Sequence, residues 1–359
     1  MDSSISVDRI EEAARVIEPV FLHSPQFDCE PLSRRLGLTT TLKVESVNPI
    51  RSFKGRGAEY LLHSLGKDVR PIVCATAGNF GQGMAYACRK RGVRITVYAP
   101  HTASPLKLER MRNLGAKIEL EVGDFDQAKD AARLHANRTG ELFIEDGLIG
   151  AIAEGAGTIG VELLEAGPLD AVFVPLGNGS LVNGVGTWIK HAAPDTMVIA
   201  VCAQTAPSMA LSFESGKPTT APSTSVADGI AVRVPVPEAV AAMRHTVDQV
   251  MLAADEEMIE WMRFLHTDAG LVIEPSGAAS LAAISRSRGH HKFTRVAAVL
   301  TGGNLTDQQG HDLGVELKAL RRSVLTCWRL SQPASSAQQT KWSIPISGDG
   351  AGSPGAEER

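Results

Sequence analysis

The sequence predicts an α/β fold whose strands run mostly parallel. Apolar strand patterns alternate with helix patterns through residues 69–149, and the alternation returns between residues 156 and 300. Such alternation is typical of parallel strands joined by helical crossovers. Several strands end in glycine-rich stretches, where ligands bind in open α/β sheets. With 359 residues, 43 % of them hydrophobic, the chain can build two domains of ordinary size or one large α/β unit.

Composition favours a protein that acts on small molecules. The 36 basic and 40 acidic side chains give a net charge of −4 without a basic block, which argues against nucleic acid or an anionic membrane as the main partner. Five scattered cysteines with no zinc spacing indicate reduced thiols and no metal site. The first twenty residues lack an apolar signal core, and no apolar run is long enough to span a bilayer. We therefore expect a cytoplasmic protein.

The amino-terminal part predicts two helices and a strand. Residues 7–17 place apolar side chains on one side of a helix, and residues 41–45 alternate as a strand does. Residues 58–65 read as a helix that leads to Gly66.

The next part predicts a small domain at residues 69–149, in which each strand is followed by a helix. Strands are expected at residues 71–76, 94–99 and 117–121, and helices at 82–90, 106–114 and 126–136.

The remainder, residues 150–330, is expected to form a large domain together with residues 1–68. It predicts helices at 156–166, 256–266 and 276–285, strands at 171–176, 197–203 and 296–300, and a loop-rich stretch at 206–236. Residues 331–359 are rich in Ser, Gly, Pro, Ala and Gln, which predicts a disordered tail.

The stretch Asn48-Pro-Ile-Arg-Ser-Phe-Lys-Gly-Arg-Gly-Ala58 is the first candidate for chemistry. It places Lys54 after an aromatic residue and among glycines, which allow other groups to approach the backbone closely. A lysine held in a dry, tight site can act as a nucleophile, a Schiff-base former or a base. The alternative is an exposed lysine at the start of a helix, since short motifs also match by chance.

Ser52-Phe53-Lys54-Gly55-Arg56-Gly57-Ala58 resembles the lysine motif of the fold-type-II pyridoxal phosphate (PLP) enzymes, in particular the branch of serine/threonine dehydratases (threonine ammonia-lyases) and serine racemases. This resemblance extends over most of the chain. It implies a tryptophan synthase β-like fold with two open, mostly parallel sheets flanked by helices, and a small mobile domain inserted in a larger PLP-binding domain. It also implies that Lys54 holds PLP as a Schiff base beside Phe53, that Ser52 contacts substrate, and that the protein is a homodimer or higher oligomer.

Leu176-Gly177-Asn178-Gly179-Ser180-Leu181 follows an apolar strand and could wrap an anion with its backbone N–H groups. A plain strand-to-helix turn is the alternative. The stretch resembles the tetraglycine loop that binds the PLP phosphate in this family, which implies that residues 177–181 bind the cofactor.

Thr76-Ala77-Gly78-Asn79-Phe80 also follows an apolar strand, and its N–H groups would suit a substrate carboxylate; the alternative is a left-handed turn. It resembles the asparagine loop of the family. The resemblance implies that all five residues contact substrate and that Asn79 also binds the PLP ring hydroxyl. Racemases carry a serine where this chain has Ala77, which favours elimination over racemisation.

Thr301-Gly302-Gly303-Asn304 is the third such stretch, with a plain Gly-Gly turn as the alternative. It resembles a Ser-Gly-Gly-Asn loop whose hydroxyl meets the PLP ring nitrogen, which implies that role for Thr301. Glu274, in a segment that also resembles the dehydratases, is expected either near the cofactor ring or in a structural ion pair.

Four departures from the family pattern concern substrate and metal. Ile50-Arg51, Phe80 and Ala156 replace common family residues, which suggests a reshaped pocket for a bulkier β-substituent. Cys202 and Ser208 stand where some racemases have metal-binding acids, so we expect no metal site there.

These observations predict a PLP-dependent lyase that converts a β-hydroxy amino acid resembling threonine or serine into a 2-oxo acid and ammonia. The alternatives are a β-replacement or a diaminopropionate-type ammonia-lyase, and then a racemase or a non-catalytic protein that retains the fold.

Overall fold

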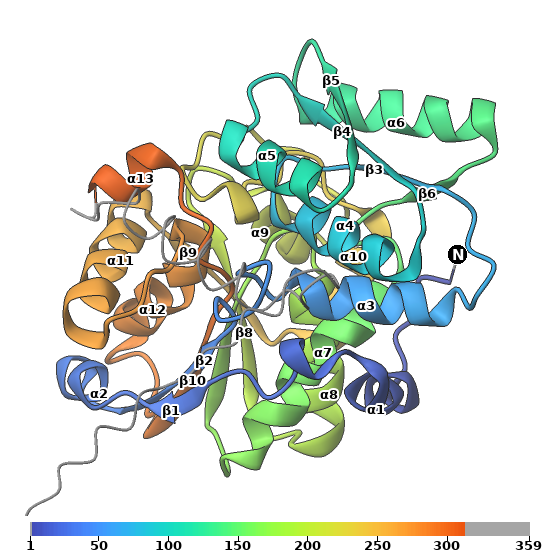
Figure 1. Ribbon diagram of the computed structural model, residues 1–359. Helices are drawn as coiled ribbons and strands as arrows, with labels where there is room; N and C mark the ends of the chain where they lie inside the picture. Colours follow the sequence, from blue (N-terminus) through green and yellow to red (C-terminus); the bar gives the residue numbers. More distant parts are fainter. Residues whose placement is uncertain (1, 313–359) are drawn as a thin grey trace, which may run out of the picture. The chain divides into compact units, whose positions relative to one another are not determined.

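Two sheets organise the part of the chain that the computed structural model describes, residues 2–312 (Figure 1). In the larger sheet the strand order is β1 (Gln26–Asp28), β2 (Thr39–Val44), β10 (Arg295–Leu300), β7 (Ala171–Pro175), β8 (Met197–Ala203) and β9 (Gln249–Ala253). In the smaller sheet it is β5 (Lys117–Glu121), β4 (Ile95–Pro100), β3 (Ile72–Ala75) and β6 (Leu142–Ile144).

Every strand pair in the two sheets is parallel except β1 with β2, so the prediction of mostly parallel strands is confirmed. Strands β7, β8 and β10 read as nearly continuous apolar runs, and almost all their residues are buried. A parallel strand with helices on both faces has no solvent side, which explains why these strands do not alternate.

The helices that accompany these strands are α1 (Val7–Val16), η1 (Pro19–Phe21), α2 (Glu30–Leu36), α3 (Lys54–Ser64), α4 (Asn79–Arg91), α5 (Pro105–Asn113), α6 (Phe125–Thr139), α7 (Gly150–Glu165), α8 (Ser180–Ala192), α9 (Ser208–Ser215), η2 (Asp228–Ile230), α10 (Pro237–Thr246), α11 (Asp255–Ala269), α12 (Pro275–Ser287) and α13 (Asp307–Asp312). Figure 1 shows α11 and α12 on one face of the larger sheet and α7 and α8 on the other. In the smaller sheet, Val73 and Tyr98 pack on α6, while Cys74 and Val97 belong to a core that includes α4 and α5.

Helix α3 links the two sheets. Ala58, Leu61 and Leu62 on this helix pack into the core of the smaller sheet. The residue before the helix, Phe53, belongs to the core of the larger sheet. All four strands of the smaller sheet fall within residues 69–149, the segment predicted as a small domain. That this segment moves as a unit stays a prediction.

Most of the predicted elements are found close to their expected positions. The stretch at 206–236 is mostly loop, as predicted, and also contains the short elements α9 and η2. Short elements such as β1 and β6 were not predicted, since they are too short to carry a period. The predicted tail at 331–359 and the end of the predicted large domain lie outside the described residues.

Helices α7 and α8 approach each other closely at a glycine, which gives a test of the packing. A Cβ at Gly184 would overlap with the carbonyl oxygen of Ala153. Gly184→Ala is therefore expected to lower the free energy of unfolding by about 1–3 kcal/mol, the usual cost of overpacking. Urea unfolding measures it.

Gly160→Ala is the matched control, since it is also in the α7–α8 contact. A Cβ there would lie 3.2 Å from the carbonyl oxygen of Val185, which a small shift accommodates. Both substitutions raise the helix propensity by the same amount. The difference between the two variants in the free energy of unfolding therefore measures the steric overlap at Gly184 alone. Equal stability of the two variants would contradict this account of the packing.

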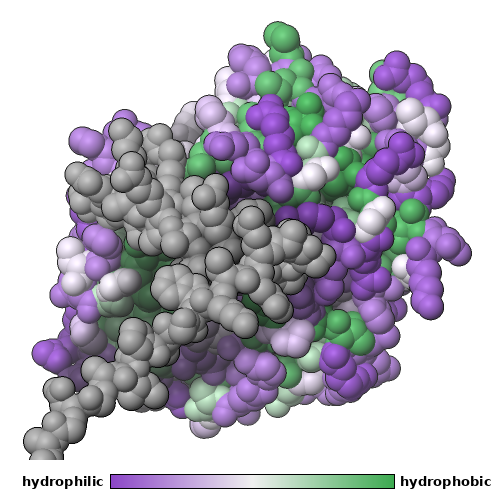
Figure 2. Space-filling view, in the orientation of Figure 1, coloured by the Kyte–Doolittle hydropathy of each residue, from purple (hydrophilic) through white to green (hydrophobic). Residues whose placement is uncertain are grey.

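The visible surface is a mixture of hydrophilic side chains and scattered apolar patches (Figure 2). Exposed apolar residues include Leu120 on β5 and the nearby Val122 and Phe125. Scattered apolar residues of this kind are normal on a protein surface. Within residues 2–312, no helix combines the length and the apolar character needed to cross a membrane.

Candidate active site

The carboxyl ends of strands from both sheets meet at one cavity of about 540 Å³. Its lining includes Ala75 at the end of β3, Ile144 at the end of β6, Pro175 at the end of β7 and Thr301 just after β10. This is the place where open α/β folds bind ligands. The strand-end loops singled out in the sequence therefore converge on one site.

Lys54 projects into this cavity from the first residue of α3. Its Nζ lies 4.6 Å from the centroid of the Phe53 ring and 5.9 Å from that of Phe80. It also donates a hydrogen bond of 2.5 Å to Oδ2 of Asp146, and the side chain is only 16 % exposed. The alternative of an exposed lysine at a helix start is therefore wrong.

The segment before Lys54 is held by side-chain and backbone contacts. Asn48 accepts hydrogen bonds from the N–H groups of Ile50 and Ser52 and donates to the carbonyl oxygens of Glu45 and Ser52. Phe53 donates its N–H to the carbonyl oxygen of Thr301, 3.1 Å away. These contacts fix the start of α3 against the loop that follows β10.

The glycines around Lys54 allow the close approach that the sequence predicted. A Cβ at Gly55 would overlap with the ring of Phe21, and one at Gly57 would lie 2.6 Å from the carbonyl oxygen of Ile152. On the other side, a Cβ at Gly83 would lie 2.8 Å from the carbonyl oxygen of Lys54. Helix α3 is thus enclosed by neighbours that leave no room for side chains.

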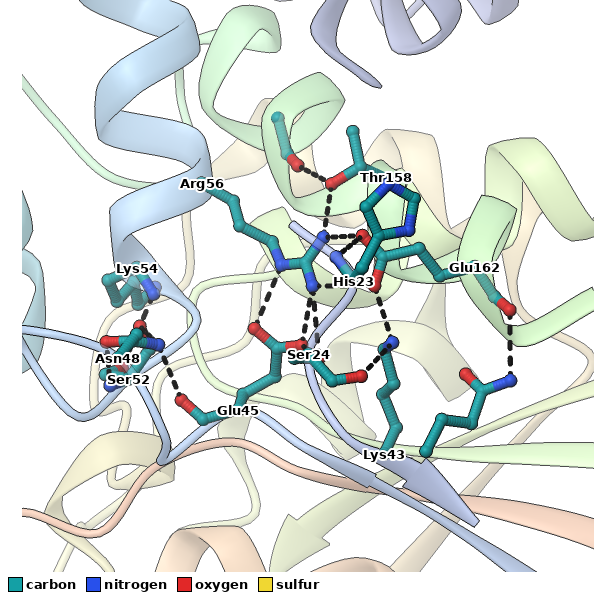
Figure 3. A network of polar contacts seen from close by, with 12 residues as sticks. His23, Ser24, Lys43, Glu45, Asn48, Ser52, Lys54, Arg56, Thr158 and Glu162 are labelled. Atoms are coloured by element: carbon teal, nitrogen blue, oxygen red, sulfur yellow. Dashed lines mark hydrogen bonds and ion pairs between the residues drawn. The ribbon is translucent and has the colours of Figure 1, made fainter. Parts of the chain in front are cut away.

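Arg56 anchors the same helix through a buried network of charges (Figure 3). Its guanidinium, which is fully buried, forms ion pairs with Glu45 at 2.9 Å and with Glu162 at 2.6 Å. Lys43 adds an ion pair of 2.5 Å to Glu162, so two positive side chains balance two negative ones. Burial acts to raise the pKa of Glu162, but Arg56 and Lys43 outweigh it and lower the pKa to about 2. This network holds β2, α3 and α7 together through Arg56, two residues after Lys54.

The loop between β7 and α8 has a geometry that could hold an anion. Gly179 has a φ of 95°, and no side chain caps the first N–H groups of α8. A Cβ at Gly177 would lie 2.6 Å from the carbonyl oxygen of Gly229, so the loop also passes close to the next segment. An uncapped helix start at a glycine turn fits a phosphate group.

Ser180, at the start of α8, connects this loop to Lys54. Its hydroxyl donates a hydrogen bond of 2.6 Å to Oδ1 of Asp146 and accepts one from the N–H of Gly147. The other carboxylate oxygen of Asp146 receives the Lys54 ammonium. Asp146 therefore lies between the predicted phosphate loop and the Lys54 amine.

The loop between β3 and α4 offers a second uncapped helix start. Helix α4 begins at Asn79, and Gly78 before it has no side chain to cap the free N–H groups. Such groups lack partners within the helix and can bind a carboxylate. Asn79 donates to Oε1 of Glu274 at 2.7 Å and accepts from Nδ2 of Asn304 at 2.9 Å.

Glu274 lines the cavity, and its N–H donates to the carbonyl oxygen of Gly302, the residue after Thr301. It accepts hydrogen bonds from Asn79, from the hydroxyl of Ser276 and from the N–H of Asn304. Burial raises the pKa of Glu274 above its usual value, and the charge of Lys107 opposes this only in part. Of the two expectations for Glu274, a position in the site is favoured, since Glu274 lines the cavity and accepts hydrogen bonds from neutral groups there.

Almost every residue predicted for the site lines the cavity. The lining includes Phe53, Lys54, Thr76, Ala77, Gly78, Asn79, Phe80, Gly177, Asn178, Gly179, Ser180, Leu181 and Thr301. Ser52 does not line it. This residue is fully buried, and its hydroxyl accepts the N–H of Lys54 at 3.4 Å.

Two of the departures that were expected to reshape the pocket lie elsewhere. Phe80 lines the cavity, but Arg51 and Ala156 do not. Ala156 is part of the core of the larger sheet. Arg51 has a φ of 54°, and burial lowers the pKa of its guanidinium. The expectation that Ile50-Arg51 and Ala156 reshape the pocket was therefore wrong, since only Phe80 of these departures lines it.

Several charged residues that line the cavity were not assigned to the site from the sequence, among them Lys107, Asp146 and Asp228. Asp146 follows the short strand β6 directly, and that position at a strand end could have indicated it. Nothing in the pattern around Lys107 distinguishes it from a surface lysine. Within residues 2–312, no group of three His, Cys, Asp or Glu side chains is placed to hold a metal ion. Cys202 is buried in β8, and Ser208 donates to the carbonyl oxygen of Val232.

The chain matches known proteins over most of its length. The family model described as "Pyridoxal-phosphate dependent enzyme" matches residues 17–302. An L-threonine ammonia-lyase of Thermotoga maritima is 34 % identical over 311 residues, which are 84 % of this chain and 76 % of that protein. The chloroplastic biosynthetic threonine dehydratase of Arabidopsis thaliana is 31 % identical over 80 % of this chain and 50 % of its own length.

Solved structures give the same picture. The processed form of threonine deaminase isoform 2 from Solanum lycopersicum superposes with a TM-score of 0.79 at 28 % identity, over 87 % of this chain and 94 % of that chain. Maize serine racemase superposes with a TM-score of 0.79 at 25 % identity, over 91 % of this chain and 98 % of that chain.

Proposed function

Because this chain belongs to the pyridoxal-phosphate dependent enzyme family, we propose that it is a lyase that converts a β-hydroxy amino acid into a 2-oxo acid and ammonia. The observation that carries the proposal is the position of the Lys54 amine. It lies in the cavity, between an uncapped helix start that suits a phosphate and another that suits a carboxylate. The identity with L-threonine ammonia-lyases supports threonine as the first substrate to test.

Residues of both sheets would hold the cofactor. The N–H groups and hydroxyl of residues 177–181 would bind its phosphate, Lys54 would carry it covalently, and Thr301 and Asn79 would bind its ring. The loop at Gly177 and Gly179 and the amine beside the Phe53 ring fit such a group. When bound, the cofactor supplies the electron sink for breaking bonds at Cα.

The protein would supply orientation and proton transfer. The start of α4 at Gly78 and Asn79 would hold the substrate carboxylate, which directs the Cα–H bond toward Lys54. The Lys54 amine would then take the Cα proton. Loss of the β-hydroxyl as water and later hydrolysis give the 2-oxo acid and ammonia.

Elimination is favoured over racemisation because Ala77 has no hydroxyl to return a proton from the opposite face. Racemases nevertheless share the fold, with a TM-score of 0.79 for the maize enzyme. The β-replacement and the diaminopropionate-type reaction stay open as alternatives. Release of 2-oxo acid without an added nucleophile distinguishes elimination from replacement, and loss of optical activity without 2-oxo acid would indicate a racemase.

The test is a panel of L-threonine, L-serine, 3-phenylserine, 3-hydroxyaspartate and diaminopropionate with the PLP-loaded protein. The expected result is release of 2-oxo acid from L-threonine or another hydroxy amino acid. Phe80 is the one departure that lines the cavity, so activity on 3-phenylserine would link it to a bulky substituent. If the protein binds PLP but releases no 2-oxo acid from any of the five compounds, the proposed reaction is overturned.

Replacement of Asp146 tests the contact with the functional amine. Asp146→Asn removes the carboxylate that lies 2.5 Å from Nζ of Lys54, so the amine loses its fixed position. We expect kcat to fall by about 100-fold, the size of effect that follows misplacement of a reacting group, while the protein still binds PLP. Steady-state kinetics and the visible absorbance of the cofactor measure these two quantities.

Ser180→Ala is the matched variant, because it removes the other hydrogen bond of Asp146 and leaves the Lys54 contact. We expect it to weaken PLP binding more than it lowers kcat. If Asp146→Asn kept the wild-type kcat, the contact with Lys54 would have no part in the reaction.

Two further properties stay predictions from the family resemblance and the composition. We propose that the protein assembles as a homodimer or homotetramer and acts in the cytoplasm. Light scattering on the purified protein tests the first of these properties.

A further inference from the structure

We propose that Lys107 is the positive charge that recognises the α-carboxylate of the substrate, and that Asp228 is its counter-ion while no substrate is bound. This inference rests on the proposed function, because it assigns the residue that binds the α-carboxylate of the amino acid substrate. It adds a specificity residue on α5, a helix to which no role in the site has been assigned so far.

Lys107 is placed beside the start of α4. It is the third residue of α5, only 2 % exposed, and it lines the cavity. A Cβ at Gly78 would lie 3.6 Å from Nζ of Lys107, so the ammonium lies directly against the loop that precedes α4. The free N–H groups of that helix and the ammonium therefore converge on one region of the cavity.

The ammonium has one ionic partner among the described residues, Asp228 of η2. Burial acts to lower the pKa of Lys107, but the carboxylates of Asp228 and Glu274 outweigh it and raise the pKa. Lys107 is therefore charged at neutral pH. Asp228, by contrast, is 49 % exposed, so its carboxylate can turn to water when another anion takes its place.

A carboxylate is the group that fits between these donors. Hydrogen bonds to charged groups are about twice as strong as neutral ones. Helix α4 supplies N–H donors without a side-chain cap, and the Lys107 side chain packs against Gly78 beside these donors. A substrate carboxylate placed there would exchange one ion pair of Lys107 for another. Binding would then leave no unpaired charge buried.

The experiment compares L-threonine with L-threoninamide, which has no carboxylate. Binding to the PLP-loaded protein is followed by the change in cofactor absorbance, which does not require turnover. We expect Lys107→Met to raise the Kd for L-threonine by about 30-fold or more, equivalent to about 2 kcal/mol. The Kd for L-threoninamide should change less than about threefold. Lys107→Arg, which keeps the charge, should retain the preference for the acid.

Two further variants separate recognition from a structural role. Asp228→Asn removes the competing counter-ion and should leave L-threonine binding unchanged or tighter. A purely structural ion pair would instead make Lys107→Met and Asp228→Asn weaken binding alike, and that result would overturn the proposal. Lys129→Met is the matched control, since Lys129 also lines the cavity in ion pairs, here with Glu145 and Asp126. It should not alter the preference for acid over amide.

The outcomes also distinguish this inference from the proposed reaction. If the wild-type protein binds L-threonine but releases no 2-oxo acid, the proposed reaction fails while the Lys107 assignment is still decided by the two Kd values. If the wild-type protein binds the amide as tightly as the acid, the Lys107 assignment is overturned whatever reaction the protein performs. If Lys107→Met does not fold, the Asp228→Asn variant decides the matter. Weaker binding of L-threonine by Asp228→Asn would then be enough to overturn the Lys107 assignment.

Discussion

Lys54→Ala is expected to reduce 2-oxo acid release by at least about 1,000-fold, because it removes the side chain proposed both to carry the cofactor and to act as the base. The amine lies between the Phe53 ring and the Asp146 carboxylate, and no other lysine of the described residues shares these neighbours. The protein should still fold, since the side chain reaches into the cavity rather than the core. Borohydride reduction should fix PLP on the wild-type protein and not on the variant.

Lys129→Ala is a close control for this experiment. Lys129 lines the same cavity, and its side chain is 16 % exposed, as that of Lys54 is. Borohydride should still fix PLP on the Lys129→Ala variant, because the Lys129 amine is held in an ion pair with Glu145. Persistent 2-oxo acid release by Lys54→Ala would show that another group removes the Cα proton. Fixation of PLP on Lys54→Ala would show that another lysine carries the cofactor.

Arg56→Met is expected to lower the free energy of unfolding by about 3–5 kcal/mol, the usual cost of removing one partner of a buried ion pair. The change leaves Glu45 and Glu162 buried with Lys43 as the remaining basic partner of the network in Figure 3. Methionine fills a similar volume, so the loss comes from charge rather than from a cavity. The urea midpoint should fall while the slope of unfolding stays the same.

The pH dependence of this loss has a defined direction. The pKa of Glu162 in the folded protein is about 2, below its usual value of about 4. Its ionised form therefore stabilises the wild type above pH about 4, and that contribution is lost as the pH falls toward about 2. The difference between wild type and Arg56→Met should shrink over the same range.

Arg34→Met is the control for the loss of one arginine charge without burial. Arg34 pairs with Glu30 on the surface, where both side chains are mostly exposed, so its removal should change stability by less than about 1 kcal/mol. A loss for Arg56→Met no larger than for Arg34→Met would contradict a stabilising role for the buried network.

The positions of the strands and the site loops could be predicted because their causes are local. Residues 117–121 and 197–203 form strands with the bounds predicted for them, since apolar runs between turns need no distant partner to be recognised. Lys54 and the loops at residues 76–80, 177–181 and 301–304 carry glycines and small polar residues wherever the backbone must turn or approach a ligand. Short elements such as β6 escaped prediction because three residues carry no period.

By itself, the sequence determined that the chain alternates strands and helices, and that Lys54 lies among glycine-rich loops. Only the tertiary structure decided what surrounds the amine. Asp146 is 92 positions from Lys54, Asp228 is 121 positions from Lys107, and Glu274 is 195 positions from Asn79. A local sequence pattern reflects only the backbone conformation and the burial of its own segment. Ion pairs and hydrogen bonds over such separations instead depend on how the two sheets bring their strand ends to one cavity. The charges around the site are therefore set by packing.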